Sequence, residues 1–142
     1  WIILLLLGLW KGVGPDSQEL TGQVIDSPAD AARAAGRFLS QGIELVALSM
    51  GAHGLVLAST SQAVWARPPA VVVTNPTGAG DSLLAGLVWA LQWGLPLVDV
   101  ARWGVAAGTA SAMREGVSVG SRSQVEAVRS QVEVIDLKPG TA

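Results

Sequence analysis

The sequence contains no cysteine, no tyrosine, a single histidine and a single phenylalanine. Without cysteine the chain can form neither disulfides nor thiolate metal sites. His53 alone cannot supply a histidine cluster for a metal, and no Gly-x-Ser-x-Gly turn is present for a hydrolase triad around it. Only 14% of the residues are charged, the net charge is −2, and no basic tract occurs. We therefore expect no nucleic-acid partner.

Long apolar runs are also absent. Residues 2–7, Ile-Ile-Leu-Leu-Leu-Leu, form a run far shorter than the roughly 20 residues that a membrane span needs. The basic start and small-residue cleavage site of a signal peptide are not visible. We expect no membrane association and a cytoplasmic protein, and we interpret residues 2–7 as a central parallel strand buried on both faces.

Half of the 142 residues are apolar, which allows a substantial core. Strand-like and helix-like patterns alternate along the chain, and no linker divides it. This alternation predicts an α/β fold, with a mostly parallel central sheet flanked by helices and a single domain over residues 1–142. The expected strands are residues 2–7, 45–49, 54–57, 63–65, 71–73 and 132–135. The expected helices are residues 28–40, 81–93, 98–114 and a short last one with a Ser123/Glu126 capping box.

The most informative segment is residues 75–81, Asn-Pro-Thr-Gly-Ala-Gly-Asp. It lies between the valine run 71–73 and the apolar helical pattern 82–91. A glycine-rich turn before a helix presents free N–H groups and the positive end of the helix dipole, which together bind anions, above all phosphate. Asp81 would repel such an anion unless it has another task, such as accepting a proton from an attacking hydroxyl. The alternative is that Asp81 only caps the helix.

This segment, followed by Ser-Leu-Leu-Ala-Gly, resembles the signature of the ribokinase-like sugar kinases, the phosphofructokinase-B family. The resemblance implies a ribokinase-like layered fold. It also implies that Gly78, Ala79 and Gly80 form an anion hole for the γ-phosphate of ATP, with Asp81 as catalytic base. The Asn-Pro lead-in is most similar to the branch that contains 1-phosphofructokinase and tagatose-6-phosphate kinase. Members are about twice as long, so we expect this chain to be the incomplete C-terminal portion.

A second glycine turn, residues 49–54, follows an expected strand and is similar to the family's Ser/Thr-x-Gly-x-x-Gly element, which contacts ATP. Ligands of open α/β sheets collect beyond the carboxyl ends of the strands, which agrees with that role. The alternative is an ordinary turn between two strands. The resemblance implies a nucleotide site made of Ser49, Met50, Gly51, Ala52, His53, Gly54, Gly80, Asp81 and Gly108.

Two further segments are open to more than one interpretation. Residues 14–20 resemble the family's Lys-Pro-Asn-x-x-Glu-Leu element, in which Asn and Glu help to organise magnesium, so Glu19, with Asp16 acting through water, is the expected Mg²⁺ site. The same two carboxylates are equally typical of a capped helix start. In helix 98–114, Gly108 flanks the adenine pocket by resemblance. Close helix–helix packing explains it equally well, since a helical glycine costs about 1 kcal/mol relative to alanine.

Together the resemblance implies an ATP- and Mg²⁺-dependent kinase that phosphorylates a hydroxyl of a sugar phosphate, such as fructose 1-phosphate or tagatose 6-phosphate. Catalysis then rests mainly on positioning and charge stabilisation. The alternatives are a truncated, non-catalytic nucleotide-binding module and a kinase of unphosphorylated sugars or nucleosides. We expect this portion alone to be inactive, and the full-length protein is compatible with a homodimer.

Overall fold

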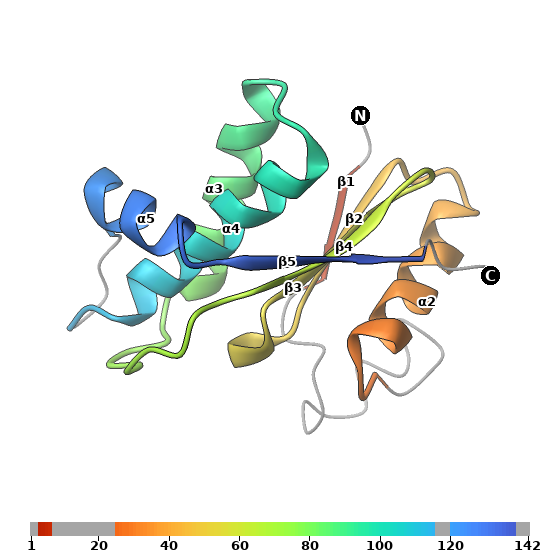
Figure 1. Ribbon diagram of the computed structural model, residues 1–142. Coiled ribbons are helices and arrows are strands. Elements are labelled where there is room, and N and C mark those ends of the chain that lie inside the picture. Colours follow the sequence, from red (N-terminus) through yellow and green to blue (C-terminus); the bar gives the residue numbers. More distant parts are fainter. Residues whose placement is uncertain (1–2, 7–24, 116–119, 139–142) are drawn as a thin grey trace. The chain divides into compact units, whose positions relative to one another are not determined.

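The computed structural model describes residues 3–6, 25–115 and 120–138 (Figure 1). The chain divides into two compact units. One comprises Trp1–Trp65 with Ile135–Ala142, and the other comprises Ala66–Val134. The second glycine turn belongs to the former unit and the phosphate turn, residues 75–81, belongs to the latter. The single domain expected over residues 1–142 therefore contains two compact units, each with its own glycine turn.

Within the described residues, five strands form one sheet in the order β1-β2-β3-β4-β5. Their bounds are β1 (Ile3–Leu6), β2 (Leu45–Ser49), β3 (Leu55–Ser59), β4 (Ala63–Arg67) and β5 (Glu133–Leu137). Strand β1 runs parallel to β2, as the apolar run predicts, but among the described strands it lies at the edge of the sheet and not at its centre. Strands β2 and β3 are antiparallel, so the expectation of a mostly parallel sheet needs correction. The reason is the short turn 50–54, because a parallel pair needs a crossover of a dozen residues or more.

The core of the first unit lies between helix α2 (Pro28–Leu39) and the strands β2 and β3. Small residues on one face of α2 let the helix come close to the sheet, and every residue of β2 is buried. The helix begins where its sequence predicts. Ser27 is the N-cap and its hydroxyl accepts from the N–H of Asp30 at 3.1 Å, while Pro28 occupies the first helical position.

Strands β3 and β4 form the expected hairpin. The Ser59 N–H donates to the Gln62 carbonyl at 2.7 Å, and the Ser59 hydroxyl accepts from the Gln62 N–H at 3.2 Å. The polar residues 59–62 therefore satisfy their own backbone groups within the turn, as short side-chain hydroxyls commonly do.

Helices α3 (Ala79–Gln92), α4 (Leu97–Ala112) and α5 (Arg122–Arg129) belong to the second unit. Helices α3 and α4 pack side by side in opposite directions (Figure 1). The rings of Trp89 and Trp103 join them at a centroid distance of 4.6 Å, and the Arg129 guanidinium of α5 lies 4.8 Å from the Trp103 ring. These ring contacts stabilise the packing of the helices.

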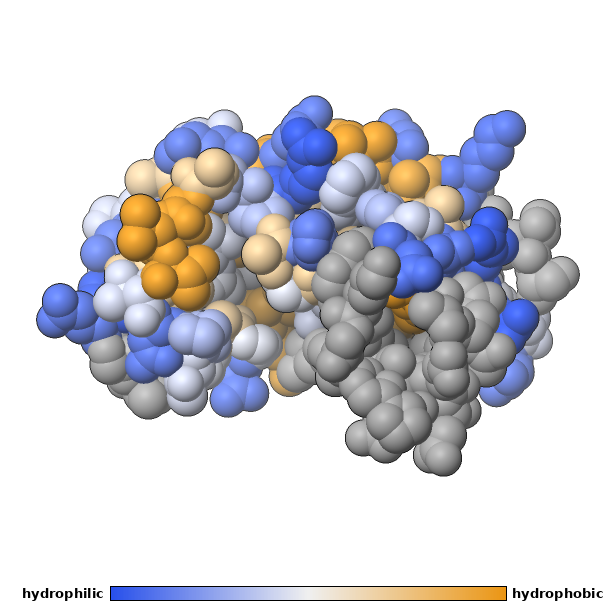
Figure 2. Space-filling model, turned by 90° about the horizontal axis from the view of Figure 1, so that it is seen from below, coloured by the Kyte–Doolittle hydropathy of each residue, from blue (hydrophilic) through white to orange (hydrophobic). Residues whose placement is uncertain are grey.

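Two local predictions are wrong. Residues 71–73 form no strand, and Val72 and Val73 are 84% and 50% exposed. The prolines at 68 and 69 lack N–H groups for a strand ladder, and the chain after the valines is bonded to α4 instead. Val72 and Val73 therefore add to the hydrophobic surface of the protein. Figure 2 shows that apolar side chains gather in patches on the face that it presents.

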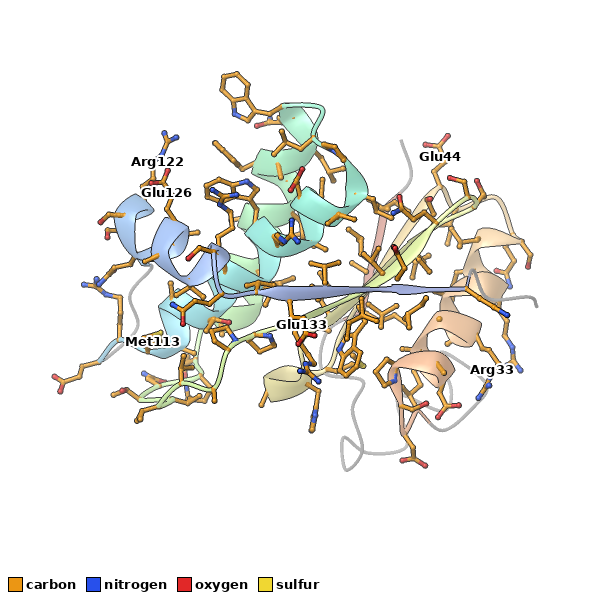
Figure 3. All side chains as sticks on the ribbon, viewed as in Figure 1. Arg33, Glu44, Met113, Arg122, Glu126 and Glu133 are labelled. Atoms are coloured by element: carbon orange, nitrogen blue, oxygen red, sulfur yellow. The ribbon has the colours of Figure 1, made fainter. Side chains whose placement is uncertain are left out.

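The last helix has its capping box at Ser121 and Gln124, not at Ser123 and Glu126. The Ser121 hydroxyl accepts from the Gln124 N–H, and the Gln124 side chain accepts from the Ser121 N–H at 2.9 Å. Glu126 instead pairs with Arg122 one turn away at 3.0 Å, and Figure 3 shows these two side chains together on α5.

The element at residues 14–20, with the expected metal ligands Asp16 and Glu19, lies outside the described residues. Among residues that are described, no group of three His, Asp or Glu side chains is arranged to hold a metal ion. None of the helices in the described part of the chain is long and apolar enough to cross a membrane.

Candidate functional site

The phosphate turn, residues 75–81, is folded by its own short-range hydrogen bonds. The Asn75 side-chain oxygen accepts from the Thr77 N–H at 3.0 Å, and the Pro76 carbonyl accepts from the Ala79 N–H at 3.1 Å. Gly78 then takes a left-handed conformation, with φ of 85°, and becomes the N-cap of α3. A side chain at this position would be strained, so the glycine is required by the turn itself.

This folding leaves a specific set of amides unbonded. The Ser82 N–H donates to the Gly78 carbonyl at 3.0 Å and so closes the first turn of α3. The N–H groups of Gly78, Gly80 and Asp81 have no backbone acceptor within the described residues. They stand at the positive end of a helix of 14 residues. Free amides at a helix N-terminus bind a phosphate group well.

Asp81 is the one carboxylate in the first turn of α3, and it is exposed. Gly78 offers no side-chain cap, and neither a hydrogen bond nor an ion pair of the Asp81 carboxylate occurs in the described part of the chain. The interpretation of Asp81 as a helix cap therefore finds no support in the geometry. Its carboxylate remains available to a ligand beside the free amides.

Helix α4 holds the chain that leads into the turn. The N–H groups of Thr74 and Asn75 both donate to the carbonyl of Ala112, at 2.9 and 3.0 Å. These two bonds fix the start of the turn on the last residue of α4. The sequence gives no signal of this role for Ala112, because a main-chain carbonyl acts through its position and not through its side chain.

Gly108 lies one helical turn before Ala112 and is buried. A Cβ atom at Gly108 would lie 3.0 Å from the Ala79 carbonyl oxygen and 3.2 Å from the Leu83 Cβ. The sequence left two interpretations of Gly108, a place beside the adenine pocket and close helix–helix packing. The structure shows the close packing directly. The neighbour is the first turn of α3, which carries the free amides.

The second glycine turn, residues 49–54, is equally well defined. Met50 and Gly54 close it with an N–H to carbonyl bond of 2.8 Å, and Gly51 and Gly54 have positive φ angles of 56° and 93°. Residues 51–53 form one exposed 3₁₀ turn, where the His53 carbonyl accepts from the Trp65 indole at 2.8 Å.

The expected nucleotide residues of this turn differ in accessibility. Gly51, Ala52 and His53 are exposed, whereas the Met50 side chain is fully buried in the core and Ser49 is 9% exposed. A ligand at this turn would meet the main chain and His53, not the Met50 side chain. A common cavity of this turn with the phosphate turn remains a prediction.

The model of the pfkB family carbohydrate kinases matches residues 15–124, more than half of the chain. This chain belongs to the pfkB family. A 1-phosphofructokinase of Vibrio cholerae is 30% identical over 130 residues, which cover 89% of this chain and 41% of the relative. A 1-phosphofructokinase of Rhodobacter capsulatus is 45% identical over 83 residues, or 58% of this chain and 25% of the relative.

A solved structure agrees with this membership. Ribokinase of Thermotoga maritima superposes with a TM-score of 0.73 at 25% identity, over 90% of this pfkB chain and 42% of the ribokinase chain. The expected ribokinase-like α/β fold is thus confirmed. The Vibrio cholerae relative is matched over about two fifths of its length. The phosphate turn and the second glycine turn both fall within the matched segment 15–124.

Proposed function

We propose that this chain is the nucleotide-binding and catalytic portion of a kinase that transfers the γ-phosphoryl group of ATP to a sugar-phosphate hydroxyl. The observation that carries this proposal is the pairing of free amides with a free carboxylate. Gly78, Gly80 and Asp81 offer N–H groups to an anion, and the Asp81 carboxylate beside them has no structural partner within the described residues. Membership of a carbohydrate kinase family supports the same reaction class.

In this proposal the Gly78–Gly80 backbone cradles the transferring phosphoryl group, and Asp81 orients the acceptor hydroxyl. The hydroxyl oxygen forms a bond to the γ-phosphorus while the bond from that phosphorus to the bridging oxygen of ADP breaks. The hydroxyl proton passes to the Asp81 carboxylate. Rate enhancement comes mainly from positioning and from stabilising charge at the equatorial oxygens.

Mg²⁺ would supply neutralisation of the phosphate charge when it is bound. Glu19 is the expected ligand, with Asp16 acting through water, and both carry the oxygen donors that this ion prefers. In the nucleotide site we propose contacts from Ser49 to Gly54. Their main-chain groups and the His53 side chain are the accessible parts, since the Met50 side chain is buried. Gly108 belongs to the same proposed site through its packing against the first turn of α3.

For the acceptor we propose fructose 1-phosphate, or tagatose 6-phosphate as a second ketohexose phosphate. Two observations support it. Asn75 and Pro76 form the lead-in that is similar to this branch of the family, and the Vibrio cholerae and Rhodobacter capsulatus relatives are 1-phosphofructokinases. The Asn75 side chain also has a structural task, because its oxygen closes the turn onto the Thr77 N–H.

A second candidate is a nucleotide-binding module without catalysis. The observation that favours it is the share of the relative that is matched, since this chain aligns with only about two fifths of the length of the Vibrio cholerae protein. A kinase of unphosphorylated sugars or nucleosides is the third, because the Gly-Asp motif is shared across the family. A cytoplasmic location and a homodimer of the full-length protein remain parts of the proposal.

Calorimetric titration with ATP, followed by an ADP-release assay with each candidate acceptor, tests this function. We expect ATP binding by the 142-residue chain, and ADP release with fructose 1-phosphate only from a chain extended to the length of the relatives. Binding without turnover in the extended chain would favour the module. Turnover with free sugars or nucleosides alone would favour the third candidate. Absence of ATP binding in both chains would overturn the proposal.

A further inference from the structure

Helix α4 contacts the phosphate turn at two points on one of its faces. At Ala112, the carbonyl accepts from the N–H groups of Thr74 and Asn75. At Gly108, one helical turn earlier, the missing side chain leaves room for the carbonyl of Ala79. The first contact fixes where the turn begins, and the second fixes how closely the first turn of α3 approaches α4.

We infer that Gly108 is a positioning residue for phosphate binding, acting through Ala79 and not by touching the ligand. This inference rests on the proposed function. The Ala79 carbonyl shares one peptide unit with the free N–H of Gly80, so a displacement of that carbonyl moves this donor directly. A Cβ at residue 108 would lie 3.0 Å from the Ala79 oxygen, closer than ordinary van der Waals contact, and the backbone at Ala79 would have to yield by a few tenths of an ångström.

The same helix pair offers a matched control at Gly86. A Cβ there would lie 2.7 Å from the Trp103 carbonyl oxygen and 3.0 Å from the Ala107 Cβ, a tighter contact than at Gly108. Gly86 lies two helical turns along α3 from its N-terminus, away from the free amides. Gly86→Ala should therefore disturb the α3–α4 packing at least as much as Gly108→Ala does, without moving the phosphate turn.

The experiment compares the 142-residue chain with its Gly108→Ala and Gly86→Ala variants. ATP is titrated into each isotope-labelled protein, and the affinity is read from the amide resonances of Gly78, Gly80 and Asp81, with urea unfolding measured in parallel. We expect Gly108→Ala to weaken ATP binding roughly tenfold, the size expected for one charge-assisted hydrogen bond. Gly86→Ala should lose at least as much stability and keep its ATP affinity within about twofold.

Equal weakening by both variants would overturn the inference, because the effect would then follow general packing. Unchanged affinity in Gly108→Ala would overturn it as well. If Gly108→Ala does not fold, the inference is tested by measuring amide hydrogen exchange in the unmodified chain with and without ATP. ATP should then slow exchange at Thr74 and Asn75 together with Gly80, and protection at Gly80 alone would contradict the role of α4. No ATP response in the unmodified chain would instead refute the proposed function.

Discussion

The indole N–H of Trp65 donates to the main-chain carbonyl of His53 at 2.8 Å. This bond ties strand β4 to the exposed 3₁₀ turn that follows β2. Two glycines with positive φ give the turn its shape, and the indole fixes the carbonyl at its last residue. One side chain of the hairpin thus orients the turn that we propose as part of the nucleotide site.

The first prediction concerns this bond. Trp65→Phe keeps an aromatic ring but removes the donor, and we expect the free energy of unfolding to fall by about 0.5–1.5 kcal/mol, the net contribution of one hydrogen bond. Urea unfolding measures the change. Trp93→Phe is the control, because Trp93 is 70% exposed and its substitution should change stability by less than about 0.5 kcal/mol. Equal losses in the two variants would show that the indole bond contributes nothing specific.

The second prediction concerns Asp81 as general base. Asp81→Asn keeps the shape of the side chain but cannot take up the proton, so kcat should fall about 10²–10⁴-fold while ATP affinity changes little. The assay needs the extended chain with fructose 1-phosphate. Asp99→Asn is a matched control, since Asp99 also lies in the first turn of a helix but pairs with Arg102. Near-normal turnover in Asp81→Asn would remove the central residue of the proposed mechanism.

The third prediction separates backbone strain from ligand binding at Gly78. Gly78→Ala and Gly94→Ala each place a Cβ on a residue with positive φ, 85° and 66°, which costs about 1–2 kcal/mol of stability in both variants. Of these two glycines, Gly78 carries a free amide of the phosphate turn, whereas the Gly94 N–H already donates to the Leu91 carbonyl. We expect calorimetry to show weaker ATP binding in Gly78→Ala and unchanged binding in Gly94→Ala. A parallel loss of affinity in both variants would argue against an anion site at Gly78.

The fourth prediction tests the cap of the last helix. Ser121→Ala removes the hydroxyl that accepts from the Gln124 N–H, and typically such a change costs about 1 kcal/mol. Ser123→Ala, at the position that the sequence pattern favours, should cost less than about 0.5 kcal/mol. Thermal or urea unfolding distinguishes the two. A larger effect at Ser123 would mean that the helix begins two residues later than the structure places it.

The local features of this protein follow from the sequence. Ser27 and Pro28 begin α2 as predicted, since capping depends on residues within one helical turn. The hairpin β3–β4 and the strand β2 follow from apolar runs bounded by polar or glycine turns. The sequence also determines the second glycine turn, residues 49–54, and helix α3, which has Asp81 in its first turn. Each of these features is fixed by contacts between residues close in the chain.

Other features depend on which elements meet in the folded chain. The valines at 71–73 have the composition of a strand, but no strand of the described residues pairs with them, and Thr74 and Asn75 bond to Ala112 instead. Both Ser121 and Ser123 are suitable N-cap residues for α5, and in the folded chain Ser121 is the N-cap. Gly108 is a helical glycine in the sequence, and only the packing of α4 against α3 shows that it leaves room for Ala79. The sequence by itself determines the phosphate turn, whereas tertiary contacts with α4 decide how that turn is held, because hydrogen bonds and close approaches between distant residues leave no periodic signal in the chain.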